Sequence, residues 1–217
     1  AADQAAAAYA REAEQLTQAR QQAAARLGRQ ISDAMQQLGM EGGRFEVTIS
    51  PATQPGVSGQ DAIDFLVAGH AGSTPRQIAK VASGGELSRI ALAIAVTTSQ
   101  LGSAPTLIFD EVDAGVGGLV AHTVGRLMRQ LGSDRQVLAV THLPQVAAHG
   151  HHHLRVSKAV SLHDGRQATV SQTQALDTRQ RVQELTRMLG STSDSAATLL
   201  HATEMLQAAH ASSSPTP

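Results

Sequence analysis

Apolar residues in the first 40 positions recur at steps of three and four, which is the spacing of one face of an α-helix. The segment is rich in Ala and Gln and contains no Pro, a composition typical of helices. The apolar stripe consists of Leu16, Ala19, Ala23, Leu27, Ile31, Ala34 and Leu38. The pattern predicts one long amphipathic helix that ends near Gly39, and it leaves open whether this helix is a strand of a coiled coil.

Beyond the helix the pattern changes to short alternating segments. Residues 45–49 alternate apolar and polar side chains, and residues 63–68 indicate a second strand. Residues 51–60 are rich in Pro, Gly and Ser and are expected to be an exposed loop. The sequence therefore predicts an antiparallel hairpin over residues 45–68.

The middle of the chain alternates short apolar runs with longer amphipathic segments. We expect buried strands at residues 106–109 and 137–140, with helices over 87–101 and 119–131. Short apolar strands separated by helices are typical of a parallel sheet with helical crossovers, so the fold class is α/β. The remaining elements expected are a hairpin over 159–174, helices over 179–188 and 195–209, and a frayed tail over 212–217.

Composition narrows the range of functions. The chain has 217 residues, of which 41% are hydrophobic, so it is long and apolar enough to fold and is not a disordered chain. Aromatic residues make up only 2%, which argues against a single-strand binder that stacks bases. The net charge of -1 provides no general attraction to nucleic acid or anionic membranes, so any such contact needs a local patch.

The residues and segments that the sequence lacks set expectations about the cellular compartment of the protein. The chain has no Cys, which excludes disulfides and thiolate metal sites. Neither an apolar run long enough to span a membrane nor a signal peptide is present, and we expect a cytoplasmic protein without membrane contact. The chain begins Ala-Ala-Asp-Gln, without Met, and is expected to be a piece of a longer protein.

The first candidate site is the segment Ser83, Gly84, Gly85 and Glu86. Ser83 and Glu86 have the spacing of a capping box at a helix start. That ordinary role does not explain two Gly residues in the first turn, where each costs about 1 kcal/mol of helix propensity. Side-chain-free positions at a helix N-terminus leave backbone N–H groups open to an anion, so the segment is a candidate phosphate site.

The second and third candidates follow the two expected parallel strands. Asp110 and Glu111 come directly after the first strand, with Asp113 close by, and His142 follows the second. One carboxylate can hold Mg²⁺ while its neighbour deprotonates a water, and the histidine can reach a phosphate. The alternatives are solvated strand ends and a merely exposed or structural histidine.

Together these motifs resemble those of ABC-type ATPases: the signature motif at residues 83–86, a Walker B strand at 107–111, a D-loop at 113–118 and a switch histidine at 142. In amino-acid sequence these motifs are similar to those of the RecN family of bacterial DNA double-strand-break repair proteins, which are SMC-like ATPases. The similar stretches are Ala-Ser-Gly-Gly-Glu-Leu-Ser-Arg at 82–89, Phe-Asp-Glu-Val-Asp-Ala-Gly-Val-Gly-Gly at 109–118, Thr-His-Leu-Pro-Gln-Val-Ala-Ala at 141–148 and Arg-Met-Leu-Gly at 187–190. The resemblance runs from about residue 40 to about residue 206.

The resemblance implies a role for each candidate residue. In this family two heads enclose two ATP molecules, so the signature residues Ser83, Gly84, Gly85 and Glu86 would meet the γ-phosphate bound to the opposite head. Asp110 would support Mg²⁺ and Glu111 would act as general base. Asp113 and Gly115 would belong to the D-loop that communicates across the dimer, and His142 would sense the γ-phosphate.

One motif of the family is missing. The only lysines, Lys80 and Lys158, lie outside any Gly-rich phosphate loop. In the family that loop lies before the coiled coil, so the resemblance implies the C-terminal lobe of a split ATPase head. The expected domains are the base of a coiled-coil arm at 1–40, the head part at 41–210 and a flexible tail at 211–217.

The implied function is ATP-driven head dimerisation and hydrolysis in DNA double-strand-break repair and recombination. The implied partners are the N-terminal half of the same head, a second head, and DNA ends or single-stranded overhangs, with the protein associated with the nucleoid. This fragment alone would not turn over ATP. The alternative is an SMC-type chromosome-organising scaffold with nucleotide-gated DNA clamping. A transporter subunit is a weaker alternative, because a coiled-coil helix precedes the hairpin.

Two further clusters have ordinary explanations. His149, His151, His152 and His153 invite a zinc hypothesis, but adjacent histidines on a strand alternate faces, and an exposed polar segment is the expectation. Arg126, Arg129 and Arg135 have the positions of a DNA-backbone contact, and a solvated helix face is the expectation for them.

Overall fold

The computed structural model describes residues 2–81, 83–99, 104–163, 166–190 and 195–211. The chain divides into two compact units, residues 1–103 and residues 104–217. No helix within these described ranges combines the length and the hydropathy of a membrane span. The arm, head part and tail expected from the sequence stay predictions, and residues 212–217 lie outside the described part of the chain.

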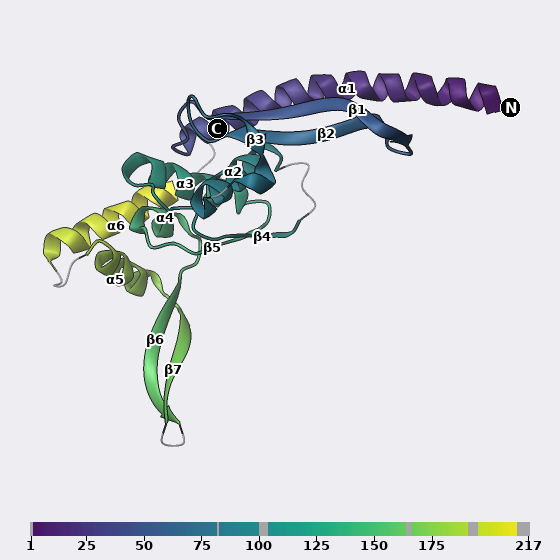
Figure 1. The fold of residues 1–217 in the computed structure, drawn as a ribbon. Helices are drawn as coiled ribbons and strands as arrows, with labels where there is room; N and C mark the ends of the chain where they lie inside the picture. The colour runs from purple at the N-terminus through teal and green to yellow at the C-terminus, as the bar shows by residue number, and fades with distance from the viewer. Residues whose placement is uncertain (1, 82, 100–103, 164–165, 191–194, 212–217) are drawn as a thin grey trace. The chain divides into compact units, whose positions relative to one another are not determined.

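The first unit is built on a long helix and a β-hairpin. Helix α1 spans Ala2–Gln37 and lies along strands β1 (Arg44–Gly56) and β2 (Gly59–Ala68), as Figure 1 shows. The antiparallel hairpin is confirmed, with Phe45 opposite Val67. The predicted loop over 51–60 is wrong, because the strands continue through it and Pro51 pairs with Asp61. Strand β1 is at the edge of its sheet, where a Pro without an N–H donor is tolerated.

The face of α1 that meets the hairpin differs from the predicted stripe. The buried residues of the helix are Ala13, Gly28, Ile31 and Met35. Leu38 is buried just beyond the helix, whereas Leu16 is 38% exposed and Ala19 and Ala23 are exposed. A Cβ on Gly28 would lie 3.1 Å from the carbonyl oxygen of Phe45, so the small residue permits close packing. The stripe was therefore correct only towards the C-terminal end of the helix.

Polar contacts also tie α1 to the hairpin. Arg20 Nη1 lies 2.8 Å from Asp61 Oδ2, and the hydroxyl of Thr17 donates to Asp61 Oδ1 at 2.8 Å. The Asp61 side chain is only 4% exposed. The hydrogen bond from Arg20, aided by that from Thr17, holds the pKa of Asp61 below its ordinary value. The helix and the hairpin are thus joined by charge as well as by packing.

The first unit ends with a short strand and a helix. Strand β3 (Arg76–Gln77) pairs with β2 and leads through a 3-10 turn at Ile78–Lys80 to α2, which spans Gly84–Thr97 and packs on α1. The helix begins three residues before the predicted range of 87–101, at the cap that the spacing of Ser83 and Glu86 predicted. It ends at Thr97, and the predicted end at residues 100–101 lies outside the described residues.

The second unit begins with the predicted parallel pair. Strand β4 (Thr106–Phe109) and strand β5 (Gln136–Ala139) are parallel, and helix α3 (Gly118–Leu131) connects them. Parallel neighbours need such a crossover, so the α/β pattern is confirmed. Helix α4 (Pro144–His149) was not expected; its first turn holds Pro144, a residue tolerated there because that N–H has no helical partner.

A second hairpin and two helices complete this unit. Strands β6 (Leu154–His163) and β7 (Arg166–Ala175) form a long antiparallel ribbon, drawn in green in Figure 1. The hairpin begins five residues before its predicted start at 159, and residues 164–165 lie outside the described part. Helices α5 (Thr178–Met188) and α6 (Ala196–Ala211) match the prediction to within two residues at each end.

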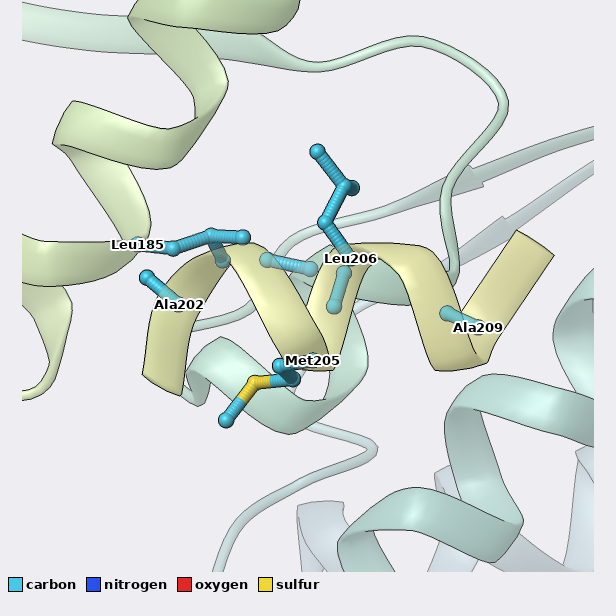
Figure 2. Close-up of a cluster of buried hydrophobic side chains, with 7 residues drawn as sticks. Leu185, Ala202, Met205, Leu206 and Ala209 are labelled. Atoms are coloured by element: carbon cyan, nitrogen blue, oxygen red, sulfur yellow. The ribbon is translucent and has the colours of Figure 1, made fainter. Parts of the chain in front are cut away.

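Helices α4, α5 and α6 share one apolar core, part of which Figure 2 shows. Its buried members are Ala147, Ala148, Leu185, Ala202, Met205, Leu206 and Ala209. Arg181 of α5 is 6% exposed and donates to the carbonyl oxygens of Ala148, Gly150 and His151 at 3.4, 2.7 and 3.2 Å. This guanidinium anchors the loop after α4 by satisfying backbone acceptors that the fold has buried.

We expect Gly125→Ala in α3 to destabilise the chain by about 1–3 kcal/mol, the cost of overpacking a core. A Cβ on Gly125 would lie 2.6 Å from Cδ2 of the buried His149 ring. In an unobstructed helix the same change stabilises by about 1 kcal/mol. Urea unfolding followed by circular dichroism measures the difference.

The double variant Gly125→Ala with His149→Ala is the control for this clash. Removal of the ring should eliminate most of the penalty that Gly125→Ala adds, since the added methyl group then has space. A single Gly125→Ala variant that is more stable than the native chain would contradict the packing described.

Candidate functional site

The carboxyl ends of β4 and β5 form one edge of the parallel pair. Phe109, the last residue of β4, lies opposite Ala139 of β5, and the N–H of Val140 donates to the Phe109 carbonyl at 3.0 Å. Asp110 and Glu111 follow β4 directly, and Thr141 and His142 come two and three residues after β5. In α/β proteins this edge of a sheet is where ligands bind. The two sets of polar residues that the sequence singled out thus meet at one place.

Asp113 is the centre of a hydrogen-bond network at this edge. Its side chain is 2% exposed, and its Oδ2 accepts from the hydroxyl of Thr141 and from the backbone N–H of His142, the latter at 3.1 Å. Nδ1 of the His142 ring lies 3.4 Å from the same oxygen, while the ring as a whole is 74% exposed. The N–H of Leu143 donates to the Thr141 hydroxyl at 3.0 Å. The network joins the loop after β4 to the loop after β5.

Glu111 occupies a backbone conformation that L-residues rarely adopt. Its φ is 55°, and it is the one non-Gly residue with positive φ among those that the structure describes. Its carbonyl accepts from the N–H of Ala114 at 3.0 Å in the turn that follows, and its side chain is exposed. Such conformations cost about 1–3 kcal/mol and cluster at functional sites. The fold therefore keeps a strained backbone at the residue predicted to act as base.

Glycines shape the rest of this loop. Gly115 has φ of 72°, a value at which a side chain would be strained, and Gly117 is the N-cap of α3. The N–H of Val116 donates to the carbonyl of Asp113 at 3.3 Å. This turn lets the chain reverse direction while the Asp113 carboxylate stays buried against the loop after β5.

The signature segment lies in the first unit. Ser83 is the N-cap of α2, and its Oγ accepts from the N–H of Glu86 at 3.4 Å. Ser83 and Gly84 are exposed, whereas Gly85 is buried. The exposed helix start offers backbone N–H groups and the positive end of the helix dipole to an anion. The structure thus brings together the candidates of the second unit and presents the signature residues on the first.

Sequence reasoning missed Thr141. Its hydroxyl donates to Asp113 and accepts from Leu143, so it links the two loops at the strand ends. The available signal was weak: a Thr immediately before the candidate histidine, at the end of an apolar strand. A hydroxyl at such a position is common, and its partner is 28 residues away in the chain.

The histidine-rich segment differs from its expectation. His149 is buried, whereas His151 and His152 are exposed and His153 is half-buried, so an exposed polar segment is wrong for His149. Within the described ranges, no grouping of His, Asp and Glu has the arrangement of a protein-only metal site. The His149 ring packs edge-on to His122 of α3, with 5.9 Å between the ring centroids.

The carboxylates after β4 suit a magnesium ion that is held partly by its substrate. Mg²⁺ is usually bound by one or two carboxylates together with phosphate oxygens and water, and not by a full cage of protein ligands. The exposed position of Asp110 at the strand end fits that chemistry. The residues present therefore agree with a nucleotide-bound ion at this edge.

The sequence of the chain is similar to those of known DNA repair proteins. No protein-family model matches it. It is 44% identical over 196 residues to the DNA repair protein RecN of Haemophilus influenzae, a match that covers 90% of this chain and 34% of that protein. With the DNA repair protein RecN of Vibrio cholerae the identity is 46% over 198 residues, covering 91% and 35%. The chain thus spans about a third of the length of the curated relatives it matches.

A solved structure supports the fold. The Smc head domain with a coiled coil and joint from Pyrococcus yayanosii superposes with a TM-score of 0.51 at 22% identity, covering 74% of this chain and 28% of that one. The expected fold class, the C-terminal lobe of an ABC-type ATPase head with a preceding helix, is therefore confirmed. In sequence, the chain is a relative of the RecN proteins and corresponds to the C-terminal part of their length.

Proposed function

We propose that this chain is the C-terminal part of an ATP-hydrolysing head that acts in DNA double-strand-break repair. The observation that carries the proposal is the edge formed by β4 and β5, where Asp110 and Glu111 follow one strand and the loop that holds His142 follows the other. The relatives support the repair role, because they are named DNA repair proteins. The parallel strand pair with carboxylates and a histidine at its carboxyl edge supports the chemistry.

Each residue at the edge has a distinct task in this proposal. Asp110 would hold the Mg²⁺ that neutralises charge on the phosphates of ATP. Glu111, exposed at the strand end, would take a proton from the attacking water. His142 would contact the γ-phosphate through its exposed ring. The strained backbone of Glu111 supports its assignment, because strain of this kind is usually retained for function.

The signature residues would act on a nucleotide held by a second head. Ser83 and Gly84 are exposed at the start of α2, whose N–H groups and dipole suit a γ-phosphate. Gly115 would belong to the turn that faces the second head. Two heads would thus enclose two ATP molecules, and hydrolysis would let them separate. Asp113 is buried within its own chain, so its contribution to that contact would be indirect.

In this proposal, further strands from elsewhere in the protein would complete the parallel pair of strands. Parallel sheets are normally covered on both faces, yet Ile108 is 70%, Leu138 43% and Val140 63% exposed. Within the described residues this sheet has only two strands. We assign the cover to the N-terminal half of the same head, which in the family carries the phosphate-binding loop.

Helix α1 would form the base of a coiled-coil arm. One face of the helix packs on the hairpin, and Leu16 lies at the edge of that face beside Gly59, while Ala19 and Ala23 remain exposed. These exposed apolar positions are available to the opposite, antiparallel arm of the same protein. The arms would connect the nucleotide cycle of the heads to DNA ends or single-stranded overhangs.

The test is steady-state ATP hydrolysis by this chain, by the N-terminal half of the head, and by the two combined, with and without DNA ends. We expect turnover only in the combination, because the phosphate-binding loop and Glu111 would lie on different polypeptides. Absence of turnover in a combination shown by gel filtration to be a stable complex would overturn the proposal. Salt-resistant capture of DNA by such an inactive complex would indicate a nucleotide-gated scaffold instead.

A further inference from the structure

Asp113 has an environment that a residue of an intermolecular contact loop does not need. Its carboxylate is 2% exposed and accepts from the Thr141 hydroxyl and the His142 N–H on another loop. Burial of a carboxylate is costly unless hydrogen bonds satisfy it. These bonds satisfy one oxygen of Asp113, Oδ2, and they use the loop after β5 to do so. Asp113 therefore helps to hold the loop that carries His142 in place.

The His142 ring lies beside Asp113, and this position bears on which ring nitrogen carries the proton. Nδ1 is 3.4 Å from Oδ2 of Asp113, and the ring is otherwise 74% exposed. A carboxylate beside one ring nitrogen favours a proton on that nitrogen, and this orients the ring and selects its tautomer. Nε2 then carries the lone pair of the neutral ring and lies on the side away from Asp113.

We propose that Asp113 is a positioning residue for His142: its buried carboxylate holds the loop after β5 and keeps the imidazole proton on Nδ1, so that Nε2 is the nitrogen presented to the nucleotide. The catalytic meaning of this inference rests on the proposed function. The arrangement of these three residues does not depend on the proposed function, because Asp113, Thr141 and His142 all lie in the second unit of this chain. Thr141 completes the device by bonding to Asp113 and to the N–H of Leu143.

The first test is nitrogen-15 NMR of the histidine rings of the intact chain, with the His142 signals assigned by comparison with His142→Gln. We expect the Nδ1–H tautomer for the neutral His142 ring. We expect Asp113→Asn to raise the Nε2–H fraction, because the amide oxygen that must accept from the N–H of His142 is neutral and favours a proton on Nδ1 less than the carboxylate does. Asp134→Asn, at an exposed aspartate of the same unit, is the matched control. If the neutral His142 ring of the native chain is the Nε2–H tautomer, that result alone overturns the proposal.

The second test is hydrolysis by the combined head. Outer hydrogen-bond partners of functional histidines typically contribute 10- to 100-fold, so we expect Asp113→Asn to lower kcat by about that factor and to change KM little. Thr141→Val should lower kcat in the same way, and Thr141→Ser should restore it. If native turnover is high and Asp113→Asn leaves kcat unchanged, the positioning role is wrong and the proposed function stands. If the combined head has no turnover while the tautomer is Nδ1–H in the native chain and shifts in Asp113→Asn as expected, the proposed function fails and the ring geometry stands.

Discussion

We expect Glu111→Gln to lower ATP hydrolysis by the combined head by about 10²- to 10⁴-fold, the usual contribution of a general base. Gln has nearly the same shape as Glu but cannot take a proton from the attacking water. Glu111 is exposed at the end of β4 and has φ of 55°, so the substitution removes one charge and leaves the strained backbone in place. Phosphate release at saturating ATP and Mg²⁺ measures the loss.

Two comparisons make this result specific. Binding of Mg²⁺ and ATP should persist in Glu111→Gln, because the substitution leaves unchanged Asp110, the proposed Mg²⁺ ligand, and the phosphate-binding loop that we propose for the N-terminal half. Glu204→Gln makes the same chemical change at an exposed position of α6 and should retain full turnover. Undiminished hydrolysis by Glu111→Gln would remove Glu111 as the base and require another group to accept the proton.

We expect the second unit to lose about 3 kcal/mol of stability as the pH falls from 6.5 to about 4, through His149 alone. Burial lowers the pKa of His149 from 6.5 to about 4, helped by the positive charges of His122, Arg129 and Arg126 on α3 and of His210 on α6. Its side chain is 6% exposed. Below pH 6.5, His149 binds a proton in the unfolded chain but stays neutral in the folded chain. The free energy of unfolding therefore falls as the pH falls, until the pH reaches the folded pKa of about 4.

The difference between the native chain and His149→Gln isolates this effect from that of the carboxylates. Urea unfolding at several pH values gives the free energy, and hydrogen exchange of peptides from α3 and α4 localises it. The variant should lose about 3 kcal/mol less than the native chain over this range. His201→Gln, at an exposed histidine of α6, is the matched control. Equal losses in the native chain and His149→Gln would show that His149 is not the titrating group.

Much of the candidate site was predictable because it depends on local pattern. The apolar runs that became β4 and β5 are each followed directly by polar residues, and the intervening helix implies that the strands run parallel. Parallel strands place their carboxyl ends at the same edge, so Asp110, Glu111 and His142 had to meet there. The start of the signature helix was also predictable, since the spacing of Ser83 and Glu86 is that of a helix cap, and Ser83 does cap α2.

Other features depend on contacts between distant parts of the chain. The burial of Asp113 required Thr141 and His142 to approach it from another strand, and no local signal distinguishes it from the exposed Asp110. The loop expected over residues 51–60 became strand because backbone pairing across β1 and β2 outweighed the turn preferences of its Pro, Gly and Ser residues. Helix α1 buries Ile31 of the predicted stripe together with Ala13, Gly28 and Met35, which the stripe did not include, and Gly28 allows close approach to β1.

The sequence by itself determined the order of the helices and strands other than β3 and α4, the parallel direction of β4 and β5, and the identity of the chemical groups at their ends. These follow from periodicity and from residue chemistry within a few positions. Only the tertiary structure decided which of those groups are buried, which nitrogen of His142 faces a carboxylate, and that His149 lies inside the second unit. Burial and hydrogen bonding depend on which segments pack together, and that choice is made by the whole chain.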